Sequence, residues 1–196
     1  MEQLKNYWKK KDACSLQKPA RRHFRRSRVI VEGLNEMTDG DLASMENVSK
    51  YNNCIKYLRI LIDVFSRFLT VRPLIDKNSK TVAKALESIF SKSHRRPKII
   101  RFDQGGEFKG AVKTYLREQG IHVFYTQNSQ IKSNYAEREI KTLKSNIYHY
   151  FMENDTYKYI DVLQKLVSSY NRSPNESLRN VTPESGTVLI ISTFHN

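Results

Sequence analysis

The sequence predicts a three-layer α/β fold in which helices cover both faces of a mixed β-sheet. Short apolar runs typical of strands alternate with segments of helical periodicity, and the first two runs are close enough in sequence to form a hairpin. Hydrophobic residues make up 39% and aromatic residues 11% of the 196 residues, which is enough for one well-buried domain.

Four apolar runs are expected to form strands. The runs 55–63 and 67–74 flank the short connection Val64–Ser66 and therefore predict an antiparallel hairpin. The runs 98–102 and 121–126 are shorter and are bounded by proline, glycine or polar residues. These two runs predict further strands of the same sheet.

Four other segments predict helices. In the first of them Val82, Leu86 and Ile89 share one face, and Asn78 or Ser79 provides the N-terminal cap. The helices are expected at residues 79–92, 107–119, about 135–152 and about 156–171.

The chain divides into a basic arm at residues 1–33, a core domain at 34–180, and a divergent tail at 181–196 that we expect to be truncated. Within the arm, the stretch KPARRHFRRSR at 18–28 is rich in arginine and has no clear period. Such a stretch is typical of a solvated arm, of a phosphate-binding tail or of a nuclear import signal. A DNA-binding arm would use the arginine side chains of Arg21, Arg22, Arg25 and Arg26.

The balance of charge favours nucleic acid as the partner. The 34 Lys and Arg residues exceed the 20 Asp and Glu residues and give a formal net charge of +14, which attracts polyanions. An acidic membrane surface is the competing partner, but the sequence has no long apolar run and no strongly amphipathic basic helix. No apolar signal peptide is visible, so we expect a nuclear or otherwise cytoplasmic location. Cys14 and Cys54 lack the paired spacing of a zinc finger.

Three acidic residues stand at the ends of predicted elements. Asp41 lies just ahead of the hairpin, Asp103 ends the third strand, and Glu137 lies in the first turn of the long helix. In open α/β sheets, strand ends and helix starts converge on functional crevices. Three carboxylates there would repel one another unless a cation neutralised them, and Mg²⁺ prefers such oxygen ligands. Two such ions can clamp the attacking and leaving oxygens of phosphoryl transfer.

Each acid taken alone also has a simpler interpretation. Glu137 suits the positive end of a helix dipole, and Asp103 suits a turn. Asp63 is expected to be a hairpin residue rather than a ligand, and Asp39 is a weaker rival to Asp41.

The helix that carries Glu137 also carries cations on the same face. Lys141 and Lys144 follow Glu137 at +4 and +7, where they are well placed to bind phosphates. The alternative is a plain i,i+4 Glu–Lys pair worth ~0.3–0.5 kcal/mol. The charge pattern alone leaves both interpretations open.

Taken together, these stretches resemble the catalytic core of retroviral-type integrases. The resemblance is carried by DLASMENVSKYNNCIKYLRILIDVFSRFLTVRPL at 41–74, IIRFDQGGEF at 99–108 and YAEREIKTLK at 135–144. The likeness is greatest to the integrases of animal mobile elements, such as Maverick/Polinton-type transposons and retrotransposons. It extends from KPARRHF to about SYNRSPNESL and implies an RNase H-like fold with a mixed five-stranded sheet flanked by helices.

The resemblance implies a D,D-35-E triad that binds Mg²⁺ or Mn²⁺, with Asp41, Asp103 and Glu137 at its three positions. Asp41 would then lie in the strand before the hairpin. The last two acids are separated by 33 residues rather than 35, which is a modest departure. Lys141 and Lys144 match helix positions that face DNA in the family.

Three other positions depart from the family pattern. Thr38 stands where a tryptophan is frequent, and Glu139 and Ile140 stand where the helix usually has an aromatic residue and an asparagine. Glu139 is expected to add negative charge near the metal or the DNA. The sequence shows neither an amino-terminal HHCC zinc module nor a carboxy-terminal DNA-binding domain.

The sequence therefore predicts a mobile-element-derived integrase catalytic domain, a metal-dependent enzyme for DNA 3′-end processing and strand transfer. It is expected to use two metal ions, to bind element ends and target DNA, and to act as a homo-oligomer. One alternative is an inactive or domesticated remnant that binds nucleic acid without cutting it. A further alternative is an RNase H-type nuclease that acts on RNA–DNA hybrids.

Overall fold

The computed structural model describes residues 31–93, 95–126 and 134–185, which belong to one compact unit. Residues 1–30, with the four arginines predicted to bind DNA, lie outside the described residues. The last part of the predicted tail, residues 186–196, also lies outside them.

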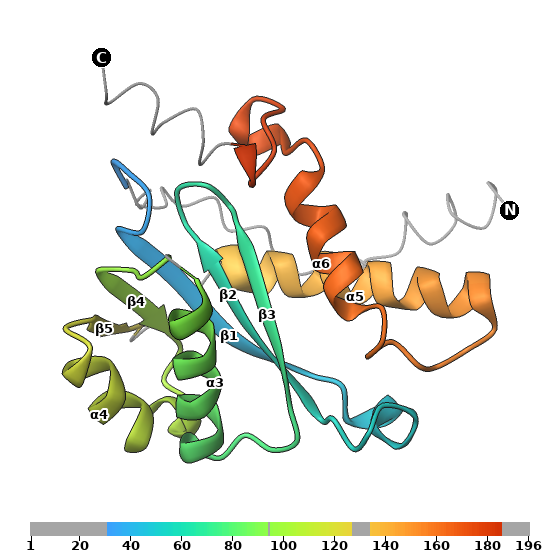
Figure 1. Ribbon diagram of the computed structural model, residues 1–196, viewed down its shortest axis with the longest axis horizontal. Helices are drawn as coiled ribbons and strands as arrows, with labels where there is room; N and C mark the ends of the chain where they lie inside the picture. Colours follow the sequence, from blue (N-terminus) through green and yellow to red (C-terminus); the bar gives the residue numbers. More distant parts are fainter. Residues whose placement is uncertain (1–30, 94, 127–133, 186–196) are drawn as a thin grey trace, which may run out of the picture. The chain divides into compact units, whose positions relative to one another are not determined.

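A five-stranded mixed sheet forms the centre of the fold (Figure 1). The order across the sheet is β3-β2-β1-β4-β5, and β2 is antiparallel to both β1 and β3. The strand β4 runs parallel to β1 and to β5, so the predicted mixed sheet is confirmed. The strands β1 to β5 span Met37–Ser44, Tyr57–Asp63, Leu69–Leu74, Ile99–Phe102 and His122–Tyr125.

The strand β1 was not evident from hydrophobic pattern. Its sequence MTDGDLAS contains a glycine and two aspartates, which have low β-propensity. Pairing with two neighbouring strands overrides that propensity. β1 pairs with β2 from Thr38 to Ser44 and with β4 from Met37 to Asp39. Asp41 therefore lies within a central strand, as the family resemblance implied, and not merely ahead of the hairpin.

Four α-helices cover the sheet in the described part of the chain, and α3 has the predicted bounds. The Asn78 side chain caps α3 by accepting the N–H of Lys80 at 3.1 Å. Val82, Leu86 and Ile89 of α3 are buried, as predicted. The helices α3 to α6 span Ser79–Lys92, Ala111–Glu118, Asn134–Asn154 and Leu163–Arg172.

Two helices begin later than the sequence predicted. The segment 107–119 is interrupted at Gly110, whose φ of +56° is not helical, so a short 3-10 turn (η2, Gly106–Phe108) precedes α4. The residues before α6 are irregular because their backbone N–H groups donate hydrogen bonds to the side chain of Asn52. Its Oδ1 accepts the N–H of Tyr159 at 2.7 Å and that of Ile160 at 3.1 Å.

Apolar side chains fill the space on both faces of the sheet. On one face, α5 and α6 pack against buried strand residues such as Ala43 and Ile60. On the other face, α3 and α4 pack against Leu61 and Ile100. This arrangement confirms the predicted three-layer α/β fold (Figure 1). No helix in the described part of the chain is both long and apolar enough to cross a bilayer.

Candidate functional site

Asp41 lies on the face of the sheet that α5 covers. Side chains alternate along a strand, and Ala43, two residues after Asp41, packs in one buried cluster with Leu143 and Ile147 of α5. Leu42, by contrast, packs against the apolar cluster on the opposite face. The side chains of Asp39 and Asp41 are therefore both on the α5 side.

The register of β1 and β4 brings Asp103 next to Asp41. These strands are parallel, and Asp39 is paired with Arg101. Strand β4 ends at Phe102, and Asp103 follows it directly, so the parallel alignment of the two strands directs Asp103 towards the part of β1 that carries Asp41. The negative charge of Asp103 accordingly acts on Asp41.

The surroundings of Asp41 raise its pKa above the ordinary value for an aspartate. Burial is the main cause, and the negative charges of Asp103 and Glu107 add to it. The Leu42 N–H, which donates to Oδ1 of Asp41 at 2.7 Å, and the positive charge of Arg59 both act in the opposite direction. A carboxylate whose ionisation is opposed by burial and by a second acid is stabilised by a nearby divalent cation.

Asp103 is oriented by Thr126, which directly follows the neighbouring strand β5. The hydroxyl of Thr126 donates to Oδ1 of Asp103 at 2.9 Å, and the Thr126 N–H donates to the Phe102 carbonyl at 3.0 Å. A carboxylate has about four acceptor sites, so one hydrogen bond fixes its direction and leaves capacity for a ligand.

Glu137 lies in the first turn of α5, as predicted, but is not gathered with the two aspartates. Its side chain is 40% exposed and forms an ion pair with Lys141, with 3.4 Å between Oε1 and Nζ. Across the described residues, no three His, Cys, Asp or Glu side chains are grouped closely enough to hold a metal ion. The structure brings together two of the three predicted acids, and a metal-binding role for Glu137 stays a prediction.

Lys141 thus makes the i,i+4 pair that was the simpler interpretation of its position. Its side chain is 75% exposed, and Lys144 is partly exposed on the same helix. Exposed pairs of this kind are worth only ~0.3–0.5 kcal/mol and are screened by salt. The pair therefore does not prevent Lys141 from binding phosphate, and DNA binding by both lysines stays a prediction.

Asp39, which the sequence offered as a weaker alternative to Asp41 for the first acid of the site, forms a buried ion pair with Arg101. Its two carboxylate oxygens accept from Nε and Nη2 of Arg101 at 2.8 and 2.7 Å. The Asp39 and Arg101 side chains are 0% and 6% exposed. Because this bidentate pairing engages both oxygens, Asp41 is the better candidate for a ligand.

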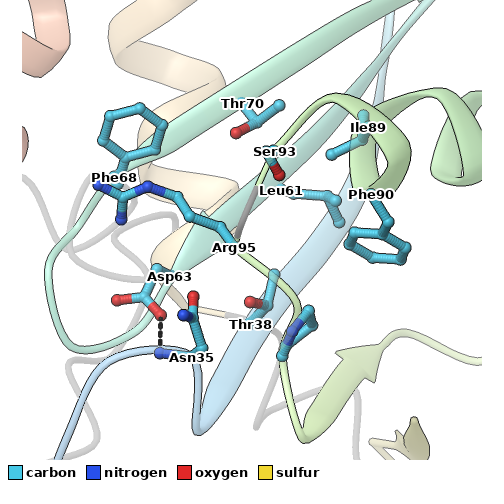
Figure 2. A pocket seen from close by; sticks show the side chains of 11 residues that line it. Asn35, Thr38, Leu61, Asp63, Phe68, Thr70, Ile89, Phe90, Ser93 and Arg95 are labelled. Atoms are coloured by element: carbon cyan, nitrogen blue, oxygen red, sulfur yellow. Dashed lines mark hydrogen bonds between the residues drawn. The ribbon is translucent and has the colours of Figure 1, made fainter. Parts of the chain in front are cut away.

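Asp63 is a hairpin residue, as predicted. Its Oδ1 accepts the N–H and the hydroxyl of Ser66 at 2.6 and 2.7 Å, and its Oδ2 accepts the N–H of Asn35 at 3.0 Å. Figure 2 shows the bond to Asn35 at the wall of a cavity of ≈ 20 Å³, which Thr38 also lines. A space of this size holds about one water molecule.

Glu139 is buried near α6, and its expected contribution of negative charge near the metal or the DNA stays a prediction. Its residue is only 6% exposed, and its carboxyl group faces the hydroxyl of Tyr170 in α6. Two residues along a helix are about 160° apart around its axis, so Glu139 and Glu137 point in different directions. Burial raises the pKa of Glu139, and burial together with the charge of Glu139 raises the pKa of Tyr170.

Two buried arginines beside the acids were missed by sequence reasoning. Arg59 of β2 is fully buried and its Nη1 donates to the Asp41 carbonyl at 3.2 Å, whereas Arg101 of β4 holds Asp39. A usable signal was present, since each arginine interrupts an otherwise apolar run. A charge inside a buried strand requires a partner.

Known proteins resemble this chain in sequence and in fold. The integrase core domain family matches residues 35–130. The chain is 33% identical over 135 residues to the transposon-derived protein F54H12.3 of Caenorhabditis elegans, and the alignment covers 68% of this chain and 47% of that protein. The chain thus spans about half the length of this curated relative.

A solved structure supports the same fold. The match is to a chain in the cryo-EM structure of the simian T-cell lymphotropic virus intasome in complex with PP2A regulatory subunit B56 gamma. The TM-score is 0.71 at 19% sequence identity, and the match covers 95% of this chain and 66% of that chain. At this level of identity the similarity concerns the fold alone.

Proposed function

Because residues 35–130 form an integrase core domain of the retroviral type with an RNase H-like fold, we propose that this chain is a mobile-element-derived integrase. In this proposal it is a metal-dependent polynucleotidyl transferase that processes DNA 3′ ends and transfers DNA strands. The similarity to a transposon-derived protein supports the origin from a mobile element.

The adjacent acids Asp41 and Asp103 are the observation that carries the proposal. Asp41 lies in β1, Asp103 directly follows the parallel neighbouring strand β4, and the negative charge of Asp103 raises the pKa of Asp41. A structural role does not account for this arrangement, because the described structure gives Asp41 no cationic side-chain partner other than the buried Arg59. Functional acids are commonly found where burial and like charge raise a pKa in this way.

Asp41 and Asp103 are the residues that would hold Mg²⁺ or Mn²⁺, with Glu137 as a third ligand from α5. The donor set fits, since both ions prefer carboxylate oxygens. The chemistry supplied by two bound ions is activation of a water or a DNA 3′-hydroxyl and stabilisation of the leaving oxygen. The chain itself keeps the acids oriented, through the Leu42 N–H on Asp41 and the Thr126 hydroxyl on Asp103.

DNA would be bound chiefly through its phosphates. The net charge of +14 favours such binding, and Lys141 and Lys144 lie on the same helix as Glu137. Integration joins two element ends to one target, which is the reason to propose a homo-oligomer as the active form. Element ends and target DNA are the partners in this proposal.

A catalytically inactive, DNA-binding remnant is the second candidate. The observation that favours it is the separation of Glu137 from the two aspartates, because no three-acid group is assembled within the described residues. In such a remnant the fold and the net positive charge of the chain would serve binding alone.

One assay separates these candidates. The chain is incubated with Mg²⁺, with Mn²⁺ or with EDTA, and with a labelled DNA duplex, a plasmid target, or an RNA–DNA hybrid of the same sequence. Metal-dependent nicking of the duplex and joining to the plasmid are the expected results. Binding without cutting in either metal would favour the remnant, and cutting of the hybrid alone would favour an RNase H-type nuclease.

A further inference from the structure

The pairing of strands β1 and β4 stops just before the two aspartates of the site. Asp39 and Arg101 are the last positions that pair in this ladder. In the described structure Asp41 and Asp103 lie beyond it, because β4 ends at Phe102, directly before Asp103. Backbone pairing therefore does not fix the distance between the two carboxylates, and other contacts must set it.

Arg59 of β2 connects the two strands at this point. Its Nη1 donates to the backbone carbonyl of Asp41 at 3.2 Å. The same guanidinium packs on the ring of Phe102, with 4.6 Å between its Cζ and the ring centre. One side chain thus contacts the backbone of the first acid and the residue that directly precedes the second acid, Asp103.

The guanidinium of Arg59 is enclosed by further contacts. The ring of Phe108 lies 4.9 Å from its Cζ and stacks on the ring of Phe102, with 4.5 Å between the two ring centres. The Tyr125 hydroxyl donates to the Phe108 carbonyl at 2.7 Å, which connects this aromatic pair to β5. On the side of β1, a Cβ at Gly40 would lie 2.7 Å from Nη2. The guanidinium therefore fills the space between β1 and the aromatic pair and has little room to move.

Stability does not account for this arginine. Its side chain is fully buried, yet Nε and Nη2 have no hydrogen-bond partner among the described residues. An incompletely bonded buried charge is destabilising, and an apolar side chain of similar volume would avoid that cost. Such departures from complete bonding are expected at functional sites. The hydrogen bond that the Arg59 side chain does make is to the backbone of Asp41.

We propose that Arg59 is a positioning residue: it holds the backbone of Asp41 against the end of β4 and so sets the separation at which Asp41 and Asp103 can share metal ions. This inference rests on the proposed function for its catalytic consequence. The placement of the two acids is a property of the chain alone, and it is measured without DNA or metal.

Two substitutions of Arg59 separate positioning from stability. Arg59→Met removes every donor and should fold at least as stably as the wild type, because the incompletely bonded charge is gone. Arg59→Lys keeps a donor for the Asp41 carbonyl but should be less stable, because it loses the planar stacking on the rings. Arg72→Met is the matched control, since Arg72 occupies the paired position on the outermost strand β3 of the described sheet. Urea unfolding gives the stability of each variant.

The first measurement is the distance between the Cγ atoms of Asp41 and Asp103 in crystal structures without metal. We expect this distance in Arg59→Met to differ from the wild-type value by more than about 0.5 Å, the tolerance within which functional groups must be held. Arg59→Lys and Arg72→Met should keep the wild-type distance. Equal distances in Arg59→Met and the wild type would overturn the positioning role.

The second measurement is Mn²⁺ binding, followed by the electron paramagnetic resonance signal of free Mn²⁺. We expect Arg59→Met to bind Mn²⁺ about 10- to 100-fold more weakly, the usual effect of losing a residue that orients metal ligands. Removing a positive charge near the site would by itself strengthen binding, so the direction of the change separates the two effects. Unchanged or tighter binding in Arg59→Met would overturn the positioning role.

The third measurement is metal-dependent DNA nicking, carried out where all variants are folded. We expect kcat to decrease in the order wild type, Arg59→Lys, Arg59→Met, while KM for DNA stays within a few-fold of the wild type and Arg72→Met stays active. This order is not the expected order of stability, and activity that follows stability would overturn the positioning role. A wild type that neither binds Mn²⁺ nor nicks DNA would contradict the proposed function. The crystal structures would still decide whether Arg59 sets the separation of the two acids.

Discussion

The guanidinium of Arg59 lies in the core against the ring of Phe102, with 4.6 Å between its Cζ and the ring centre. The ring of Phe108 lies 4.9 Å away. The Nη1 atom donates to the Asp41 carbonyl, but within the described residues Nε and Nη2 have no hydrogen-bond partner. Burial lowers the pKa of Arg59 to about 9, a sign that its charge is incompletely compensated.

Replacing this arginine by methionine should preserve or increase stability. Arg59→Met removes an incompletely bonded buried charge, and methionine adapts to irregular space between aromatic rings. We expect the free energy of unfolding in urea to rise by about 1 kcal/mol or more. Arg59→Lys, which keeps the charge but loses the planar stacking, is the control and should be destabilised. A loss of stability in Arg59→Met would show that the contacts with the rings outweigh the cost of burial.

Because Gly40 has no side chain, the side chains of Arg59 and Phe102 can pack directly against the backbone of β1. A Cβ at Gly40 would lie 2.5 Å from Cε1 of Phe102 and 2.7 Å from Nη2 of Arg59. We expect Gly40→Ala to destabilise the fold by ~1–3 kcal/mol, the usual cost of overpacking. The loss should be smaller when Gly40→Ala is introduced into a Phe102→Leu background. Equal losses in both backgrounds, measured by urea unfolding, would contradict the close approach of β1 to Phe102.

The buried carboxyl group of Glu139 should make stability depend on pH. Burial raises its pKa above the ordinary 4.5, so the folded state binds more protons than the unfolded state between the two values. The stability from this group is fully present below the unfolded pKa and is lost as pH rises through the folded pKa. Glu139→Gln should therefore gain stability relative to the wild type as pH rises from about 4 to about 8. A difference in unfolding free energy that does not vary with pH would show that Glu139 is not buried as a neutral acid.

The lysines of α5 should contribute to DNA binding through phosphate contacts. For Lys141→Gln and Lys144→Gln, we expect the slope of log K against log salt concentration to decrease in magnitude by about 1 for each residue. Lys113→Gln provides a control, because Lys113 is exposed on α4 at the opposite face of the sheet. Fluorescence anisotropy with a labelled duplex at several salt concentrations gives the slopes. Equal effects of all three substitutions would indicate a diffuse charge effect and no defined interface.

Elements with a clear local pattern were predictable from the sequence. The apolar face of α3 and its Asn78 cap are both local features, and both are present in the structure. The acids Asp41 and Asp103 were matched to each other through the family resemblance, which also implied that Asp41 lies in a strand. The strand β1 could not be found by periodicity, because Gly40 and the two aspartates interrupt its hydrophobic pattern. Hydrogen bonds to β2 and β4 on its two sides stabilise it as a strand.

Features that depend on distant side chains could not be predicted. The start of α6 is delayed by hydrogen bonds to Asn52, which belongs to a turn far earlier in the chain. The direction of Glu139 follows from packing against Tyr170. The pairing of Asp39 depends on Arg101, an arginine of another strand that no local pattern connects to it.

The most direct test of the proposed function is metal-dependent DNA nicking and joining by Asp103→Asn. Asparagine keeps an oxygen that accepts from Thr126 and removes only the negative charge. The matched control is Glu118→Gln, a change of the same kind at an exposed position of α4. We expect Asp103→Asn to bind DNA like the wild type and to lose nicking and joining in Mg²⁺ and Mn²⁺, whereas Glu118→Gln stays active. Wild-type activity in Asp103→Asn would contradict the proposal that Asp41 and Asp103 form the catalytic metal site.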